Sequence, residues 1–197
     1  SGKSVTARTI MKMLPKNSFV GSNLKVSFKG SDISNFSQEQ MRQIRGDTIT
    51  MIFQEPLTSL NPLHKIGSQI IEVLQEHNQI SKSEAKKKAL ELLKEVQIPQ
   101  PEERLNQYPH QLSGGQRQRI MIAMAIANRP DLLIADEPTT ALDVTIQSQI
   151  LKLLKELQKK YGMAIMLITH DLTVVRKTSD RICVCLLYTS DAADDDH

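Results

Sequence analysis

Two acidic residues follow a short apolar run, and together they could bind a metal ion and activate water. The run is LLIADE, residues 132–137. If its apolar part is a buried strand, Asp136 and Glu137 lie at the carboxyl edge of a sheet, where α/β proteins bind their ligands. Asp136 could then hold Mg²⁺, directly or through water, and Glu137 could serve as a general base. A strand that merely runs into an acidic turn would give the same pattern.

The chain opens with SGKS, residues 1–4, which matches the end of a phosphate-binding loop. In the full pattern, GxxxxGK[ST], backbone N–H groups and a helix N-terminus surround phosphate oxygens. Gly2, Lys3 and Ser4 fit its last three positions, so Lys3 would reach the outer phosphates and Ser4 would ligate Mg²⁺. The first glycine would lie before Ser1, and GKS alone also occurs by chance.

A third pattern, LSGGQRQR at residues 112–119, predicts a helix that begins at an anion site. Ser113 stands at the expected cap position, and two glycines allow the backbone to approach an anion closely. The helix that follows, as far as Ala127, is apolar on almost all sides and should be buried. A helix that simply starts at glycines is the alternative.

The order of these motifs resembles that of the nucleotide-binding subunit of an ABC transporter, over roughly residues 1–182. LSGGQ matches the family signature, and LLIADEP matches the strand that carries the magnesium ligand and the base. Gln54 matches the Q-loop glutamine, Asp143 closes the ALD of the D-loop, and His170 in LITHD matches the switch histidine.

The resemblance implies a mechanism in which two cassettes clasp two ATP molecules head to tail. Each nucleotide would lie between the phosphate loop of one cassette and the LSGGQ of the other, with ATP and Mg²⁺ as cofactors. The implied catalytic residues are Glu137, His170 and Gln54. The implied nucleotide-binding residues are Gly2, Lys3, Ser4, Ser113, Gly114, Gly115, Gln116 and Asp143. The implied magnesium ligands are Ser4, Gln54 and Asp136.

Two longer stretches give a finer resemblance. QEPLTSLNP at residues 54–62 and YPHQLSGGQ at residues 108–116 are similar to importers of dipeptides, oligopeptides and in some members nickel. This implies an ATPase that powers peptide import from the cytoplasmic face of the membrane as a peripheral subunit. Its partners would be a second cassette, transmembrane permease subunits and an extracytoplasmic substrate-binding protein, with no nucleic acid.

The strand and helix patterns around these residues predict an α/β fold with a parallel sheet, and the resemblance implies that this sheet belongs to a P-loop NTPase core. Apolar runs at residues 48–53, 132–135 and 164–168 suit strands buried on both faces. A helix capped by Asp143 and closed by Gly162 joins the last two strands as a βαβ unit. Residues 55–110 show helical patterns, including an amphipathic helix at 82–96, and predict a helical subdomain inserted between the Q-loop and LSGGQ.

The two ends depart from the family pattern. The sequence starts at Ser1, inside the phosphate loop. It therefore lacks three parts of the family pattern: the front of that loop, the strand before it and the aromatic residue that stacks on adenine. We therefore expect a cassette of residues 1–182 truncated at its N-terminus, which by itself binds ATP poorly. Residues 183–197 end in DAADDDH and are expected to be a disordered or non-native tail. Cys183 and Cys185, with only His197 nearby, make a poor metal site.

Composition sets broad limits on function. The 197 residues are 40% apolar and 24% charged with a net charge of +3, which is ordinary for a globular protein and too little to argue for nucleic acid. No apolar run approaches the roughly 18 residues of a spanning helix. Two other interpretations stay open, a non-transport ABC ATPase acting on DNA or ribosomes and a catalytically silent cassette.

Overall fold

A parallel sheet of three strands forms the centre of the computed structural model, which describes residues 2–21, 23–54, 59–140 and 142–185. The strands are β3 (Ile49–Ile52), β4 (Leu132–Asp136) and β5 (Ala164–Ile168), hydrogen-bonded in the order β3-β4-β5. The predicted α/β class is confirmed, although β3 is shorter than expected by one residue at each end and β4 extends to Asp136. Residues 55–58 of the QEPLTSLNP stretch, Ala141 of ALD and residues 186–197 of the tail lie outside the described residues.

The connection from β4 to β5 is the βαβ unit that the sequence predicts. Helix α8 (Val144–Tyr161) begins after Asp143, whose carboxylate accepts a hydrogen bond of 2.9 Å from the Ile146 N–H. It ends at Gly162, whose φ of +65° is the left-handed conformation that glycine adopts most readily. The short helix α9 (Leu172–Thr178) follows β5.

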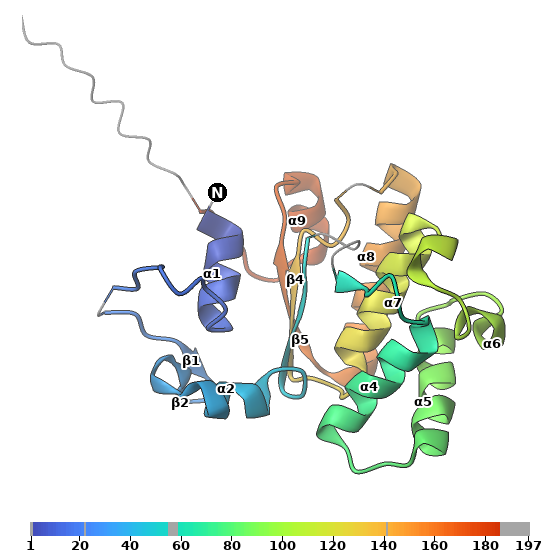
Figure 1. Ribbon diagram of the computed structural model, residues 1–197. Helices are drawn as coiled ribbons and strands as arrows, with labels where there is room; N and C mark the ends of the chain where they lie inside the picture. Colours follow the sequence, from blue (N-terminus) through green and yellow to red (C-terminus); the bar gives the residue numbers. More distant parts are fainter. Residues whose placement is uncertain (1, 22, 55–58, 141, 186–197) are drawn as a thin grey trace, which may run out of the picture.

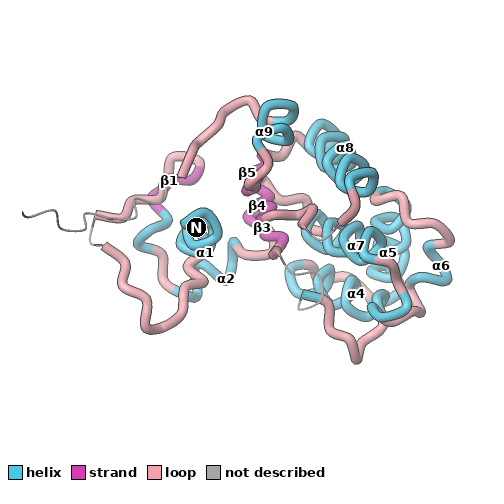
Figure 2. The backbone as a smooth tube through the Cα atoms, turned by 90° about the horizontal axis from the view of Figure 1, so that it is seen from above, coloured by secondary structure: helices cyan, strands magenta, loops and turns pink. Residues whose placement is uncertain are grey.

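Helices cover one face of the sheet in a thick layer (Figures 1 and 2). They are α4 (Ile66–His77), α5 (Lys82–Glu95), α6 (Pro101–Arg104), η2 (Pro109–Gln111) and α7 (Gly114–Ile126), together with α8. Between residues 59 and 110 the described chain contains helices and no strand, as the sequence patterns predict. The boundaries of a helical subdomain stay a prediction. Pro101 opens α6 at the first helical position, where proline is well tolerated.

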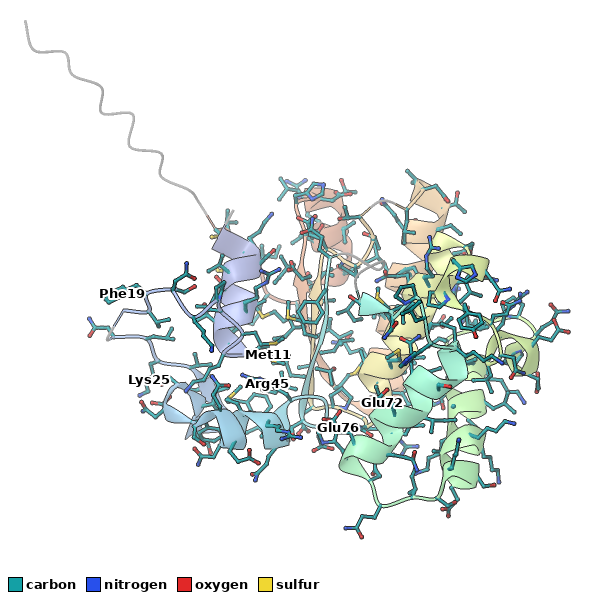
Figure 3. The ribbon with its side chains drawn as sticks, viewed as in Figure 1. Met11, Phe19, Lys25, Arg45, Glu72 and Glu76 are labelled. Carbon is teal, nitrogen blue, oxygen red and sulfur yellow. The ribbon has the colours of Figure 1, made fainter. Side chains whose placement is uncertain are left out.

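The other face carries α1 (Gly2–Ile10) and a small lobe (Figure 2). The lobe contains β1 (Ser27–Phe28), β2 (Ser31–Asp32), η1 (Ile33–Asn35) and α2 (Gln38–Ile44). Arg45, just after α2, donates hydrogen bonds to the Met11 carbonyl (2.8 Å) and the Lys12 carbonyl (2.9 Å). Figure 3 shows Arg45 beside Met11 at this end of α1, whereas Phe19 points outward from the lobe. Arg45 thus fixes the C-terminal end of the helix whose N-terminus carries Lys3.

Alternate residues of each strand face opposite sides of the sheet, which explains why the strands are apolar throughout. Ile52 and Leu133 pack into the core beneath the helical layer. Ile49, Ile134 and Ile168 pack with α1 and the lobe on the other side. None of the described helices combines the length and apolar character needed to cross a membrane.

Candidate functional site

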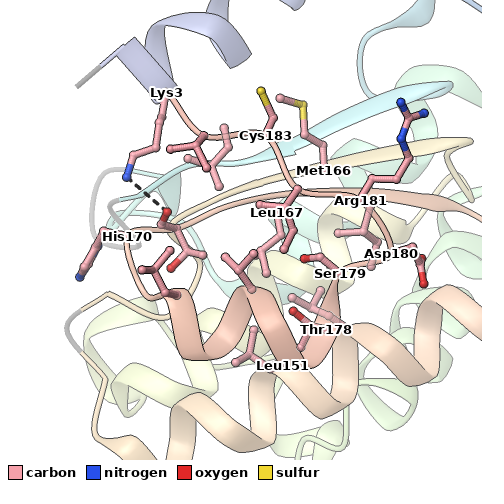
Figure 4. Close-up of a pocket in the computed structure, with 18 of the residues that line it drawn as sticks. Lys3, Leu151, Met166, Leu167, His170, Thr178, Ser179, Asp180, Arg181 and Cys183 are labelled. Atoms are coloured by element: carbon pink, nitrogen blue, oxygen red, sulfur yellow. Dashed lines mark hydrogen bonds between the residues drawn. The ribbon is translucent and has the colours of Figure 1, made fainter. Parts of the chain in front are cut away.

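Most of the residues predicted to do chemistry meet at the carboxyl edge of the sheet. Gln54 follows β3 by two residues, Asp136 ends β4, Glu137 comes next, and His170 follows β5 by two residues. Because the three strands are parallel, their carboxyl ends share this edge. The start of α1 reaches the same edge, where the Lys3 ammonium donates a 3.2 Å hydrogen bond to the Thr169 carbonyl (Figure 4).

The start of α1 is joined to the end of β4 by a hydroxyl and a carboxylate. The Ser4 hydroxyl donates a 3.0 Å hydrogen bond to Oδ1 of Asp136, which is only 2% exposed. A hydroxyl and a buried carboxylate are the hard oxygen ligands that Mg²⁺ prefers, and the N-terminus of the nine-residue α1 offers free N–H groups to phosphate. The residues present therefore fit Mg²⁺ and a nucleotide phosphate.

Three described side chains contact the carboxylate of Glu137. Oε2 accepts hydrogen bonds from the Gln54 amide (3.1 Å) and from the Thr140 hydroxyl (2.9 Å). Oε1 lies 3.2 Å from Nδ1 of His170. The Glu137 side chain is 15% exposed and the His170 side chain is 70% exposed. The acid is therefore shielded, while the histidine stands at the surface where it can meet a ligand.

The backbone at Glu137 takes an unusual conformation that places its side chain at this edge. Its φ of +46° is in the left-handed region, which is unfavourable for residues other than glycine by roughly 1–2 kcal/mol. Two hydrogen bonds hold it: the Glu137 N–H donates to the Ile168 carbonyl (2.8 Å), and the Thr140 N–H donates to the Glu137 carbonyl (3.2 Å). Five other described residues that are not glycine also have a positive φ (Lys12, Lys29, Gln97, Gln100 and Arg129), so the conformation places the side chain of Glu137 but does not by itself mark a function.

The electrostatic surroundings favour the ionised form of Glu137. Burial raises the pKa of its carboxyl, but the hydrogen bonds from Thr140 and His170, with the charges of His170 and Lys3, outweigh burial and lower the pKa. An acid with a lowered pKa is deprotonated at neutral pH. The carboxylate can therefore accept a hydrogen bond from a water molecule without first losing a proton.

A cavity of about 1070 Å³ lies beside this cluster, along β5 (Figure 4). Its lining runs the whole length of β5 and includes Lys3, His170, parts of α8 and α9, and residues 178–185. Neither Asp136 nor Glu137 is among its described lining residues. Lys3 and His170 therefore border the cavity and also act on Glu137, Lys3 through its charge and His170 through a direct contact.

The residues of the signature form a separate group at the start of α7. The Ser113 hydroxyl accepts a 3.2 Å hydrogen bond from the Gln116 N–H, and the Gln116 amide oxygen accepts one of 3.0 Å from the Ser113 N–H. This reciprocal capping box confirms the predicted cap. The hydrogen bonds of Ser113, Gln116 and Asp143 lie within the starts of their own helices.

The two glycines of the signature let α7 approach the start of α8 closely. A Cβ on Gly115 would lie 3.0 Å from Cγ2 of Ile146, and a Cβ on Gly114 would lie 3.4 Å from Cδ2 of Leu142. Close packing of two helix starts is thus one structural reason for glycine here. The start of α7 thus packs against Leu142 and Ile146, on either side of Asp143, and none of the described hydrogen bonds joins it to the group around Glu137.

The sequence interpretation missed two residues of the group around Glu137. Thr140 contacts Glu137 from three residues downstream, and Thr169 supplies its carbonyl to Lys3. A threonine gives little signal by itself. The one available sign was Pro138, because proline favours the second position of a β-turn and such a turn returns the fourth residue to the first.

The fold is that of an α/β protein with a P-loop NTPase core. Residues 1–140, more than two thirds of the chain, match the family described as ABC transporter. The chain belongs to that family.

Curated relatives of high identity are named as transport ATP-binding proteins. The chain is 58% identical to the peptidoglycan transport ATP-binding protein YejF of Agrobacterium fabrum, with 93% of the chain and 34% of that protein covered. It is 56% identical to the oligopeptide transport ATP-binding protein OppD of Bacillus subtilis (93% and 51% covered). It is 52% identical to the dipeptide transport ATP-binding protein DppD of Escherichia coli (93% and 56% covered). The chain thus spans between a third and just over half of these relatives.

Solved structures of ABC cassettes share the fold. A dimeric post-hydrolysis state of the cassette MJ0796 bound to ADP and Pi superposes with a TM-score of 0.74 at 32% identity, covering 89% of this chain and 72% of that one. The cbiO1 protein of Clostridium perfringens, described as part of the ABC transporter complex cbiONQ, gives a TM-score of 0.72 at 28% identity, covering 88% and 64%.

Proposed function

We propose that the protein containing this chain binds and hydrolyses ATP with Mg²⁺ and uses the energy to import peptides. The observation that carries the proposal is the convergence of four separate segments on one edge of the sheet: the start of α1 and the ends of the three strands. Lys3, Ser4, Asp136 and Glu137 are the residue types that phosphoryl transfer to water needs.

The residues at the sheet edge have two tasks: some bind phosphate and others hold Mg²⁺. Lys3 and the N–H groups at the start of α1 bind phosphate oxygens. Ser4, Asp136 and Gln54 are the residues that would hold Mg²⁺, which neutralises negative charge on the phosphates when bound. Preorganised charge of this kind supplies most of the catalysis expected for phosphoryl transfer, because the protein has little covalent chemistry to perform.

Glu137 and His170 act on the attacking water and the outer phosphate. The carboxylate of Glu137 orients the water and accepts its proton as the bond to phosphorus forms. His170, whose ring contacts Glu137 at 3.2 Å and is otherwise exposed, orients the outer phosphate and the water. A general base in this position contributes roughly 10²–10⁴-fold to the rate.

The signature group serves the nucleotide held by a second cassette. Ser113, Gly114, Gly115, Gln116 and Asp143 do not join the group around Glu137 within the described chain, which supports a role toward another protomer. A solved neighbour of this fold is described as dimeric and bound to ADP and Pi. We infer that closing two cassettes completes each site.

The names of relatives support a transported substrate, and the resemblance to peptide importers suggests the other partners. OppD and DppD are named for oligopeptide and dipeptide transport, so we infer a peptide substrate. The remaining partners are transmembrane permease subunits and an extracytoplasmic substrate-binding protein, and nucleic acid is not among the partners. The protein acts peripherally at the cytoplasmic face of the membrane.

The experiment that tests the proposal measures ATP hydrolysis by the complete gene product with Mg²⁺ present. Glu137→Gln keeps the shape of the side chain but removes the base, and kcat should fall at least about 100-fold. Glu102→Gln, at an exposed position on α6, is the matched control and should leave the rate unchanged. A Glu137→Gln protein with more than about half of the normal rate would contradict the assignment of Glu137. A protein that binds ATP without hydrolysing it would favour the silent-cassette alternative.

A further inference from the structure

The three partners of the Glu137 carboxylate differ in where they come from. Gln54 and His170 belong to the loops after β3 and β5, and under the proposed function both are needed at Mg²⁺ and phosphate. Thr140 lies in the same turn as Glu137 and has no assigned task at the nucleotide. Its hydroxyl makes the shortest of the three contacts, 2.9 Å to Oε2.

The turn of residues 137–140 explains why Thr140 can reach the carboxylate. The Thr140 N–H donates to the Glu137 carbonyl at 3.2 Å, which closes a four-residue turn with the buried Pro138 in its second position. Proline pre-sets the backbone there and lowers the entropy that the turn loses on folding. The main chain and the side chain of Thr140 therefore both hold Glu137, through two different hydrogen bonds.

We propose that Thr140 is the positioning residue of the general base: its hydroxyl holds Oε2 of Glu137 in place while Oε1 faces the attacking water. This inference rests on the proposed function, since it assumes that Glu137 is the base. It goes beyond that function by assigning a task to a residue that the sequence motifs do not single out.

The need for such a residue follows from the changes expected when nucleotide binds. Gln54 and His170 lie on separate loops and under the proposed function also act on Mg²⁺ and phosphate, so their distances to Glu137 change whenever these loops adjust to the ligand. A glutamate side chain has three rotatable bonds, so its carboxylate loses its fixed orientation when its hydrogen-bond partners move away. The hydrogen bond from Thr140 persists because both residues belong to one closed turn, and displacement of a reacting group by about 1 Å can reduce a rate about 100-fold.

The test compares Thr140→Val and Thr140→Ser in the complete gene product, with ATP hydrolysis measured over a range of ATP concentrations. Valine keeps the shape of threonine but removes the donor, and kcat should fall about 10-fold with KM for ATP unchanged, since the lost bond acts on the base alone. Serine keeps the donor and should recover kcat to within about twofold. Thr139→Val, which removes the neighbouring hydroxyl, is the control and should behave as wild type.

Each result decides the question. Equal losses of kcat in Thr140→Val and Thr140→Ser, or a rise in KM without a change in kcat, would overturn the proposal, because packing or nucleotide binding would then explain the effect. If the valine protein fails to fold, Thr140→Ala supplies the same comparison.

A second background separates this inference from the proposed function. In a Glu137→Gln protein the Thr140→Val change should have no further effect on kcat. An inactive Glu137→Gln protein combined with a fully active Thr140→Val protein would overturn only the role of Thr140. An active Glu137→Gln protein would overturn the role of the base itself.

Discussion

The group around Glu137 and the signature at the start of α7 are built in opposite ways. Apart from the Thr140–Glu137 contact within one turn, the hydrogen bonds of the first join distant residues: 166 apart (Lys3 to Thr169), 132 apart (Ser4 to Asp136) and 83 apart (Gln54 to Glu137). Those of the second join residues three apart, as between Ser113 and Gln116. The first group therefore exists only when the sheet has formed, whereas the second is encoded in a single turn.

The largest effect is expected in the group around Glu137, from a substitution of Asp136, its most buried residue. Asp136→Asn should reduce ATP hydrolysis by the complete gene product about 100-fold or more, because the carboxylate that would hold Mg²⁺ is lost. The free energy of unfolding should change by less than about 1 kcal/mol, since removing a buried charge also removes its desolvation penalty. ATPase assays and urea denaturation of the same protein check both results.

Asp131→Asn is the matched control, because Asp131 precedes β4 at the other end of the same strand. Its carboxylate is half exposed and pairs with Lys29 at 2.6 Å. Wild-type ATP hydrolysis is expected for this variant. Equal loss in both variants would show that charge on β4 matters generally, and not its position at the sheet edge.

A smaller effect is expected in the signature, where close packing can be tested without touching a charge. Gly115→Ala places a Cβ 3.0 Å from Cγ2 of Ile146, whereas Gly114→Ala places one 3.4 Å from Cδ2 of Leu142. The first distance is tighter than van der Waals contact and the second is ordinary. Gly115→Ala should therefore be less stable than Gly114→Ala by about 1 kcal/mol in urea denaturation. Equal stabilities would mean that the start of α8 moves freely away from α7.

The smallest effect is expected at Glu95, whose long-range contact with Lys160 lies outside the candidate site. It tests whether a long-range contact contributes strongly to stability wherever it occurs. Burial raises the pKa of Glu95 on α5, but hydrogen bonds from Lys160 and Tyr161, with the charges of Lys160 and Arg129, lower the pKa below its ordinary value of 4.5. The ionised form therefore stabilises the folded state above that value, and this stability is lost as the pH falls through the lowered pKa.

Glu95→Gln should lower the free energy of unfolding by less than about 1 kcal/mol at neutral pH, because the ion pair with Lys160 is partly exposed. The difference from wild type should shrink as the pH falls from neutral through the lowered pKa of Glu95, because the carboxyl then becomes protonated in the folded state as well. Urea denaturation over a series of falling pH values measures it. A difference that persists at low pH would point to packing and not to charge.

The same contrast explains what could be predicted from the sequence. Caps such as Ser113 and Asp143, and the αL glycine Gly162, are local and were predicted correctly. The parallel sheet was predictable because its strands are apolar on both faces. The hairpin of β1 and β2 was missed, since each strand has two residues and no alternating pattern.

The contacts within the group around Glu137 could be predicted only from the family resemblance. Residues 54, 136, 137 and 170 acquire their distances when three strands align in parallel, and no spacing in the sequence encodes that alignment. The positive φ of Glu137 was not predictable, because it depends on how the turn after β4 meets the end of β5, and Pro138 was the one sign of the contact from Thr140.

The most direct test of the account is a crystal structure of the complete gene product, carrying Glu137→Gln, with ATP and Mg²⁺. The account predicts that Mg²⁺ is ligated by the Ser4 hydroxyl at about 2.1 Å, with Asp136 bound directly or through water. It also predicts that residue 137 faces the outer phosphate and remains hydrogen-bonded to Thr140. A nucleotide bound away from the start of α1, or a side chain at position 137 turned away from the phosphate, would contradict it.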